Sequence, residues 1–259
     1  KGLTPTERLG NPAPRIAETP QGILNCVGLQ NPGIDRFIKE QIPFLRQYDT
    51  KIIANVSGNT VEEYEGMVEK ISDADVDLIE MNISCPNVKC GGMAFGTQPK
   101  MVEEVVSAAK AKAKKPLIVK LSPNVTDIAE IARAAESAGA DALSLINTLL
   151  GMRIDIKTRR PILRNNVGGL SGPAVFPVAV RMVWQTANAV KIPVVGMGGI
   201  STWEDAVEMM MAGASAVQVG AAIFADPYAP VKMIDGLEKY CEDNGIANIS
   251  EIVGTVQPW

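Results

Sequence analysis

The feature that most limits how this chain can fold is a regular alternation, from about residue 50 onward, of short apolar runs with amphipathic stretches of helical length. Alternation of this kind is typical of βα units, whose strands form a parallel sheet with helices on its faces. Strands are predicted at residues 51–56, 78–83, 117–121, 142–146, 194–197 and 216–219. Helices are predicted near residues 60–72, 99–113, 126–138, 173–190 and 203–212.

The fold class predicted from this pattern is α/β, a parallel (β/α)8 barrel of the TIM type. Six strands do not close a barrel of eight, so roughly one βα unit and another strand are expected upstream of residue 1. No linker divides the chain, and residues 1–259 are predicted to be a single domain that is incomplete at its N-terminus. An open sheet of another topology remains the alternative.

Local signals mark the ends of several predicted helices. Thr60 and Thr126 stand where N-caps are expected, each followed by acidic residues. Gly139 and Gly213 occur in repeated Ala-Gly-Ala turns, where glycine suits a helix C-terminus. These signals support the βα reading of the chain.

Two segments interrupt the alternation. Residues 4–45 are rich in proline and glycine and are predicted to form a long βα loop, which in a compact domain is usually functional. Residues 148–172 carry four arginines and fit an insertion at the top of a barrel: Arg153, Arg159, Arg160 and Arg164.

Composition excludes several classes of function. The 259 residues include no histidine, which rules out Ser-His-Asp triads, Cys-His dyads and HExxH zinc sites. A formal charge of -4 argues against a nucleic-acid partner, and no apolar stretch is long enough to span a membrane. The four cysteines show no zinc or disulfide spacing, so no metal site is predicted and the expected location is the cytoplasm.

Amide side chains gather where the predicted strands end, and in a β/α barrel the C-terminal ends of the strands carry the chemistry. Asparagine offers both donors and acceptors, which suits a neutral ring that bears amides. For any single asparagine, a turn residue that bonds its own backbone is the simpler interpretation. The residues at these ends are Asn55, Asn82, Asn87, Lys120, Asn124, Asn147 and Thr148.

Cys85 is the candidate reactive side chain. It precedes Pro86 in a loop at the predicted barrel mouth, and an ionised thiol there could serve as a base with Lys1, Lys89 or Lys120 nearby. The alternative is an inert buried thiol, the usual state of a free cysteine.

Two glycine clusters indicate a cofactor that bears a phosphate, and a third is weak evidence by itself because glycine-rich loops also simply turn. Residues 196–201 and 220–222 follow the last two predicted strands, where barrels commonly bind phosphate through backbone N–H groups. Residues 168–173 are predicted to be a third glycine loop that opens into a helix. The first cluster is no Rossmann fingerprint, because Ser201 stands where the third glycine belongs.

With these residues placed, the chain resembles the class 1 dihydroorotate dehydrogenases, most closely their NAD-linked class 1B catalytic subunit. The element Asn-x-Ser-Cys-Pro-Asn at residues 82–87 is specific, and Val88 to Gly92 resembles the NAD-linked type. The other matching stretches are residues 10–15, 25–33, 120–124, 146–148, 168–172 and 198–200.

The resemblance implies a reaction and its residues. (S)-Dihydroorotate would be oxidised to orotate in pyrimidine biosynthesis, with Cys85 as the base at C5 and FMN as the hydride acceptor. Implied substrate-binding residues are Lys1, Asn25, Val27, Gly28, Leu29, Asn82, Asn87, Asn147 and Thr148. Implied FMN-binding residues are Lys1, Gly2, Asn55, Asn82, Lys120, Ile146, Gly172, Gly198, Gly199, Gly220 and Ala221.

The resemblance also implies partners. Electrons would pass to NAD through a separate subunit that carries FAD and an iron-sulfur cluster, and the core would be a homodimer. Two alternatives remain at this point: another FMN-dependent barrel that acts on a pyrimidine or an enone, and a flavin-free barrel that serves only in binding or assembly.

Overall fold

The computed structural model describes residues 2–84 and 95–259. The chain divides into two compact units. The first comprises Lys1–Pro12 and Val27–Leu143, and the second comprises Ala13–Cys26 and Ser144–Trp259. Each unit contains its own strands and helices.

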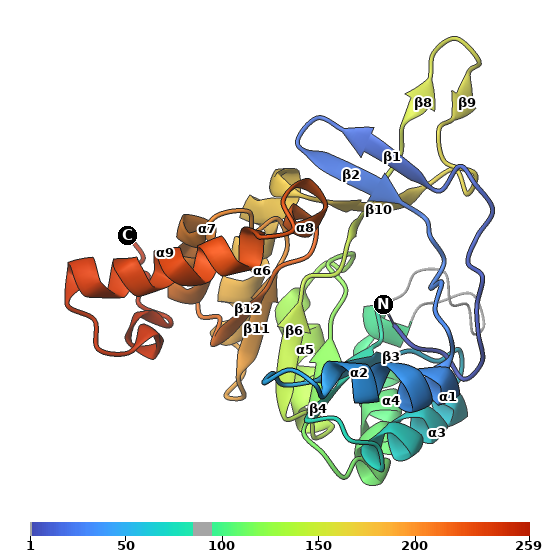
Figure 1. Ribbon diagram of the computed structural model, residues 1–259, viewed down its shortest axis with the longest axis horizontal. Coiled ribbons are helices and arrows are strands. Elements are labelled where there is room, and N and C mark those ends of the chain that lie inside the picture. Colours follow the sequence, from blue (N-terminus) through green and yellow to red (C-terminus); the bar gives the residue numbers. More distant parts are fainter. Residues whose placement is uncertain (1, 85–94) are drawn as a thin grey trace. The chain divides into compact units, whose positions relative to one another are not determined.

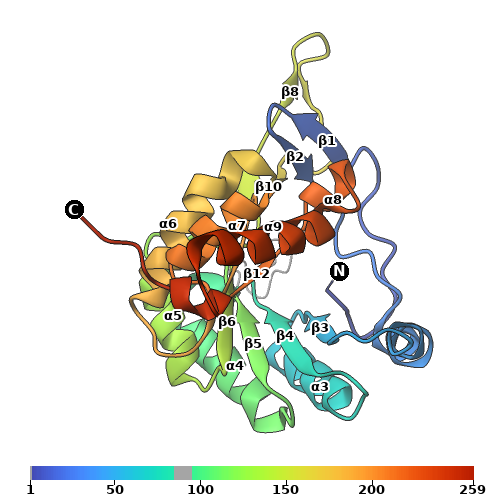
Figure 2. The same cartoon turned by 60° about the vertical axis from the view of Figure 1, so that its left-hand side comes forward.

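The first unit is built on three parallel strands in the order β5-β4-β3. They are β3 (Ile53–Val56), β4 (Leu78–Asn82) and β5 (Leu117–Lys120). Figures 1 and 2 show the helices of this unit running beside the strands. These helices are α3 (Val61–Ser72), α4 (Pro99–Lys112) and α5 (Ile128–Ser137), with a short 3-10 turn, η2 (Phe95–Thr97), before α4.

The two faces of this three-stranded sheet differ in chemistry, because successive side chains on a strand point to opposite faces. One face is apolar and has no exposed surface at Val56, Ile79, Met81, Leu117 or Val119. The other face carries Asn55, Glu80, Asn82 and Lys120, paired in register as Asn55 with Glu80 and Asn82 with Lys120. We call this second face the polar face.

The N-terminal part of the first unit contains more secondary structure than a long loop. Residues 34–45 form the helical segment α1 (Ile34–Arg36), η1 (Phe37–Gln41) and α2 (Ile42–Leu45). Leu3 bridges Val56 in parallel, with Leu3 N donating to Asn55 O at 2.8 Å. The prediction of an irregular loop over residues 4–45 is therefore wrong.

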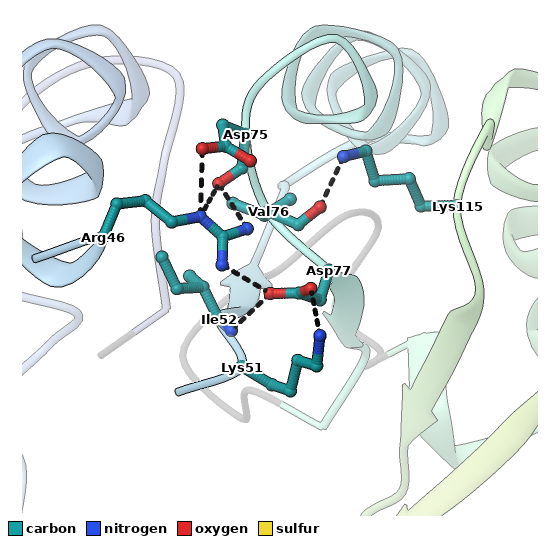
Figure 3. A network of polar contacts seen from close by, with 7 residues as sticks. All are labelled: Arg46, Lys51, Ile52, Asp75, Val76, Asp77 and Lys115. Carbon is teal, nitrogen blue, oxygen red and sulfur yellow. Dashed lines mark hydrogen bonds and ion pairs between the residues drawn. The ribbon is translucent and has the colours of Figure 1, made fainter. Parts of the chain in front are cut away.

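A polar network anchors the start of β3 and β4 (Figure 3). Asp77 accepts a hydrogen bond from Ile52 N at 2.8 Å and pairs with Arg46 at 2.9 Å and Lys51 at 3.4 Å. The Ile52 N–H, with support from Arg46 and Lys51, lowers the pKa of Asp77 to about 2. Arg46, just after α2, thereby ties that helix to the sheet.

The second unit contains the later strands of the βα pattern. β6 (Ala142–Leu145) crosses from the first unit into the second, and the strand order continues β12-β11-β6 with β11 (Val194–Met197) and β12 (Ala216–Gln218). Ile146 N, at the end of β6, donates to Met197 O at 2.8 Å. The helical elements are η3 (Pro173–Val175), α6 (Phe176–Ala187), α7 (Trp203–Met211), α8 (Ala222–Ala225), α9 (Ala229–Asn244) and η4 (Ile249–Ile252).

An antiparallel sheet, absent from the sequence prediction, also belongs to the second unit. Its order is β1-β2-β10-β7 (Figure 1). The strands are β1 (Ile16–Thr19), β2 (Gly22–Asn25), β7 (Leu149–Gly151) and β10 (Gly168–Ser171). Between β7 and β10 projects a two-stranded hairpin of β8 (Ile154–Asp155) and β9 (Arg160–Pro161).

The structure tests the local predictions one by one. All six predicted strands form, and Thr60 caps α3 by accepting from Glu63 N at 3.2 Å. Thr126 is not a cap, because Asp127 accepts the N–H bonds at the start of α5 instead. Residues 168–171 form a strand rather than a loop. Within the described ranges, no helix has the length and apolar character needed to cross a bilayer.

Candidate functional site

The predicted site residues fall in both units, and the arrangement within each unit is described separately. Cys85, Asn87 and Lys1 lie outside the described residues. In the first unit the described candidates are Gly2, Val27, Gly28, Leu29, Asn55, Asn82 and Lys120. In the second they are Asn25, Ile146, Asn147, Thr148, Gly172, Gly198, Gly199, Gly220 and Ala221.

Asn55 and Glu80 form a buried polar pair on the polar face. Asn55 Nδ2 donates a short hydrogen bond to Glu80 Oε2, and the Glu80 side chain is almost fully buried. Asn55 Oδ1 is buried and has no hydrogen-bond partner among the residues that the structure describes. An unsatisfied buried acceptor costs about 1–3 kcal/mol, so this oxygen fits a donor supplied by a bound group.

Gly2 lies against this orphaned oxygen. A Cβ atom built on Gly2 would stand 2.8 Å from Asn55 Oδ1 and 3.6 Å from the Ser57 side chain. Ser57 is fully buried, and within residues 2–84 and 95–259 its Oγ has no partner either. The structure thus brings Gly2 and Asn55, both predicted to bind the cofactor, together beside two unsatisfied polar atoms.

Asn82 and Lys120 occupy neighbouring strand ends. Asn82 Oδ1 accepts from Ser84 N at 3.2 Å and from Ser84 Oγ at 2.6 Å, and Tyr64 Oη donates to Asn82 O at 2.7 Å. These bonds fix both the side chain and the backbone of Asn82. The side chain of Lys120 is half-buried and, among the residues that the structure describes, forms no hydrogen bond or ion pair. Its charge is available to a bound anion.

The segment Val27 to Leu29 is held in an unusual backbone conformation. Gly28 and Leu29 have φ values of 77° and 54°, a region that side-chain-bearing residues seldom adopt. Buried Asn31 donates from Nδ2 to Leu29 O at 2.6 Å and to Thr4 Oγ1 at 2.8 Å. Its Oδ1 accepts from Thr4 N at 3.2 Å and Gly33 N at 2.9 Å, so one amide ties Leu29, the end of the segment, to Thr4 and Gly33.

In the second unit, Asn25 and Thr148 meet at Gly169. Asn25 Nδ2 donates to Gly169 O at 3.4 Å, and the two residues are register partners on β2 and β10. A Cβ atom on Gly169 would stand 2.0 Å from Thr148 Oγ1. Asn147 Oδ1 accepts from Thr148 N at 2.9 Å. Three predicted substrate-binding residues of this unit are therefore gathered around one glycine.

Three glycines predicted to hold a phosphate also come together. Gly172, Gly198 and Gly199 have φ values of 102°, 127° and 79°. A Cβ on Gly199 would stand 2.8 Å from Gly172 O and from Phe176 N, and one on Gly198 would stand 3.0 Å from Ile146 Cγ1. The backbone conformation and the close approach both require glycine here.

A cavity of about 840 Å³ lies in the second unit, and both Gly172 and Ala221 line it. Gly198, Gly199 and Gly220 are not among its lining residues. Its only lysine, Lys232, is paired with Asp226 at 2.6 Å, and the lining also contains Glu18 and Glu204. The Lys232 hydrogen bond lowers the pKa of Asp226. Side-chain charge in this cavity does not favour an anion, so a phosphate would depend on backbone N–H groups.

Three residues of these arrangements were missed in the sequence. Glu80 is a lone carboxylate in the apolar run Leu78 to Met81, which is a usable signal because a buried charge needs partners. Asn31 lies in the stretch 25–33 that matches the family, but no role was predicted for its side chain. Gly169 could be recognised only through its contacts with Asn25 and Thr148.

Comparison with known proteins gives one consistent family. The family model described as dihydroorotate dehydrogenase matches residues 1–241. The dihydroorotate dehydrogenase B (NAD(+)) catalytic subunit of Alkaliphilus oremlandii is 62% identical over 254 residues, which cover 98% of this chain and 84% of that protein. The subunit of the same name from Bacteroides thetaiotaomicron is 57% identical over 258 residues, covering 99% of this chain and 85% of that one.

A solved structure supports the fold. DHODH from Eimeria tenella, crystallised in complex with ferulenol, aligns with a TM-score of 0.81 and 24% sequence identity. The alignment covers 98% of this chain and 77% of that chain. Together with the parallel strands and their helices, this likeness confirms the predicted class, a parallel α/β barrel.

Proposed function

The chain belongs to the dihydroorotate dehydrogenase family, and we propose that it is the FMN-binding catalytic subunit of an NAD-linked enzyme that oxidises (S)-dihydroorotate to orotate. The single observation that carries this assignment is the family match over residues 1–241. The amide-rich strand ends give it a physical basis, because dihydroorotate presents ring amides and a carboxylate to its site.

The proposal assigns substrate binding to neutral amides, backbone groups and one lysine. Asn25, Asn147 and Thr148 would hold the ring, supported by their arrangement around Gly169. Val27, Gly28 and Leu29 would contribute backbone groups, supported by the conformation that Asn31 maintains. Asn82 would contribute from the polar face, and family resemblance adds Asn87 and Lys1.

The proposal assigns FMN to residues from both units. Asn55, Asn82, Lys120 and Ile146 would contact the ring and ribityl chain, with Gly2 and Lys1 beside them. The orphaned Asn55 Oδ1 supports this fit because it lacks a donor. Gly172, Gly198, Gly199, Gly220 and Ala221 would hold the phosphate, and the close backbone packing of the first three supports a cradle without side chains. When bound, FMN supplies the hydride acceptor.

The chemistry removes one proton and one hydride from the substrate. In the proposal the thiolate of Cys85 would take the proton from C5, and a bound flavin would supply the acceptor for the hydride of C6. The amides would keep C6 in position, and the charge of Lys120, which has no partner in the described part of the chain, would offset negative charge that develops nearby. No histidine is available for the basic role, which agrees with a cysteine base.

The name of the relatives, catalytic subunit, implies a second subunit. We propose that this partner carries FAD and an iron-sulfur cluster and reduces NAD, and that two copies of the present chain form the core. We further propose that the two units are parts of one FMN-binding domain and that the enzyme works in the cytoplasm.

The test is orotate formation by the full-length, FMN-loaded protein with dihydroorotate and an artificial dye as electron acceptor. The expected result is dye reduction with orotate produced in equal amount. Dihydrouracil and a simple cyclic enone serve as comparison substrates. Turnover of these compounds without orotate formation from dihydroorotate would favour another FMN-dependent barrel and overturn the assignment.

A further inference from the structure

We propose that Glu80 is a positioning residue for FMN: its carboxylate decides which end of the Asn55 side-chain amide is offered to the cofactor. The site residues that the family resemblance implies do not include Glu80. The inference rests on the proposed function, because it takes FMN as the bound group, and it adds a residue that acts on FMN only through Asn55.

An asparagine side chain can present either end of its amide to a ligand, two N–H donors or one carbonyl acceptor. The two ends have nearly the same shape, so the neighbours of Asn55 decide which end is free. A carboxylate accepts hydrogen bonds and does not donate them, and Asn55 accordingly turns its Nδ2 atom toward Glu80 Oε2. The carbonyl end, Oδ1, is thereby left for a donor from another group.

The sheet directs Glu80 toward Asn55. Strands β3 and β4 lie side by side in the first unit (Figure 1), and the register partners of Glu80 are Asn55 on β3 and Ile118 on β5. Of these two neighbours only Asn55 has a polar side chain. Glu80 is 4% exposed and Ile118 is 3% exposed. Burial of a carboxylate is costly unless hydrogen bonds compensate it, so this carboxylate holds the Asn55 amide in one orientation.

The free end of the amide lies in a closely packed, polar place. Gly2 packs against it, since a Cβ on Gly2 would stand 2.8 Å from Asn55 Oδ1. Ser57 beside Gly2 is 0% exposed, and over the described ranges neither Asn55 Oδ1 nor Ser57 Oγ has a partner. An acceptor in this position needs a donor. FMN carries donors on its ribityl hydroxyls and one ring nitrogen, whereas a phosphate dianion offers only acceptors.

A purely structural role for Glu80 is the alternative, and the hydrogen bonding argues against it. Glutamine has nearly the same shape, carries no charge to bury, and can donate to Asn55 Oδ1 through its own amide. For stability alone, glutamine at position 80 would therefore serve better, because it removes both the buried charge and the unsatisfied acceptor. The carboxylate instead keeps that acceptor open for a ligand.

The experiment measures FMN affinity and stability in the full-length protein with the substitution Glu80→Gln. Quenching of flavin fluorescence gives the dissociation constant of FMN, and urea unfolding of the FMN-free protein gives the midpoint. The matched control is Glu63→Gln on α3. Glu63 Oε2 accepts from Asn59 N and Asn59 Nδ2 at 2.7 Å each, which makes a second carboxylate–asparagine pair in the same unit, outside the proposed site.

Glu80→Gln is expected to bind FMN roughly tenfold more weakly, about the worth of one hydrogen bond. Its urea midpoint is expected to equal or exceed that of the wild type, because the buried charge is gone and Asn55 Oδ1 has gained a donor. Glu63→Gln should bind FMN like the wild type, with a midpoint no higher than the wild type. A purely structural Glu80 would lose stability and affinity together.

Two double variants test whether Glu80 acts through Asn55. In Asn55→Ala/Glu80→Gln, the second substitution should cause no further loss of FMN affinity beyond that of Asn55→Ala. Asn55→Asp/Glu80→Gln exchanges the two partners: the new glutamine donates to the new aspartate, whose second oxygen again offers an acceptor. This exchange should restore FMN affinity to within about threefold of the wild type.

Three results would overturn the inference. The first is wild-type FMN affinity in Glu80→Gln, and the second is an additive loss of affinity in the Asn55→Ala background. The third is a lowered urea midpoint in Glu80→Gln together with an affinity loss that the exchange does not restore. A wild type that binds FMN but forms no orotate would contradict the proposed function alone, whereas a wild type that binds no FMN would contradict both.

Discussion

Asn55 donates its side-chain amide hydrogen to Glu80 across two parallel strands, and its own buried carbonyl oxygen has no donor in the described part of the chain. The pair occupies the polar face, opposite a face made only of apolar side chains. A buried acceptor that lacks a donor needs an explanation, and a bound ligand that supplies the donor provides one.

Asn55→Ala is expected to lower the free energy of unfolding by about 1–3 kcal/mol, because buried Glu80 loses one of its hydrogen-bond donors. FMN is also expected to bind more weakly. Urea unfolding of the FMN-free protein and a flavin fluorescence titration measure the two effects separately. Asn124→Ala, which removes a half-buried amide at another strand end, is the control. Wild-type FMN affinity in Asn55→Ala would contradict the role of Asn55.

Gly199→Ala is expected to destabilise the protein by at least about 1–2 kcal/mol, because an L residue is strained at φ 79° and its Cβ would meet Gly172 O at 2.8 Å. FMN retention during gel filtration is expected to fall. The matched control is Gly66→Ala in α3, where a Cβ meets nothing within 4 Å. That variant should gain up to about 1 kcal/mol from helix propensity. Equal effects of the two substitutions would contradict the proposal that Gly199 belongs to a backbone cradle for the phosphate.

Asn31→Asp separates the bonds that the Asn31 side chain accepts from the bonds that it donates. The carboxylate keeps the acceptor role toward Thr4 N and Gly33 N but loses the donor bond to Leu29 O. We therefore expect a raised KM for dihydroorotate in both Asn31→Asp and Asn31→Ala, and a loss of stability in Asn31→Asp at least as large as the loss of about 2–3 kcal/mol in Asn31→Ala, because the buried carboxylate would face Leu29 O. Steady-state kinetics and urea unfolding give the comparison. An unchanged KM in both variants would remove residues 27–29 from substrate binding.

Asp77 gives a prediction about pH (Figure 3). Its pKa in the folded protein is about 2, below the ordinary value of 3.8, so its contribution to stability is complete above pH 4 and is lost as the pH falls toward 2. The stability difference between wild type and Asp77→Asn should therefore shrink over this interval. Urea unfolding from pH 7 to pH 2.5 measures it. Asp75→Asn, at an exposed partner of Arg46, should change stability less at every pH.

The βα part of the fold could be predicted because each strand and helix carries a strong local pattern. Val194–Met197 was predicted to the residue, and the other strands to within one or two residues. The antiparallel sheet could not be predicted in this way. Residues 168–171 read as a glycine loop, and only pairing with β2, more than 140 residues away, makes them a strand. Helix α9 was missed because Gly236 weakens the signal of its interior, although Pro230 stands in its first turn, where proline favours a helix start.

In the candidate site, too, some residues could be recognised from the sequence around them, whereas others depend on contacts with distant parts of the chain. Asn25, Asn55, Asn147 and Thr148 were identifiable because they follow runs of strand character or match a family motif. Glu80 and Gly169 owe their roles to neighbours on other strands, which sequence spacing does not reveal. The role of Asn31 depends on its contact with Thr4, on a separate stretch of chain.

The most direct test of the central claim, that a thiol base serves flavin reduction by dihydroorotate, is anaerobic rapid mixing of FMN-loaded protein with dihydroorotate while the flavin absorbance is followed. Wild type is expected to bleach in one turnover. Cys85→Ala should stay yellow before mixing and bleach at least ~100-fold more slowly, whereas Cys241→Ala should match the wild type. A wild-type flavin that does not bleach, or an unchanged rate in Cys85→Ala, would contradict the account.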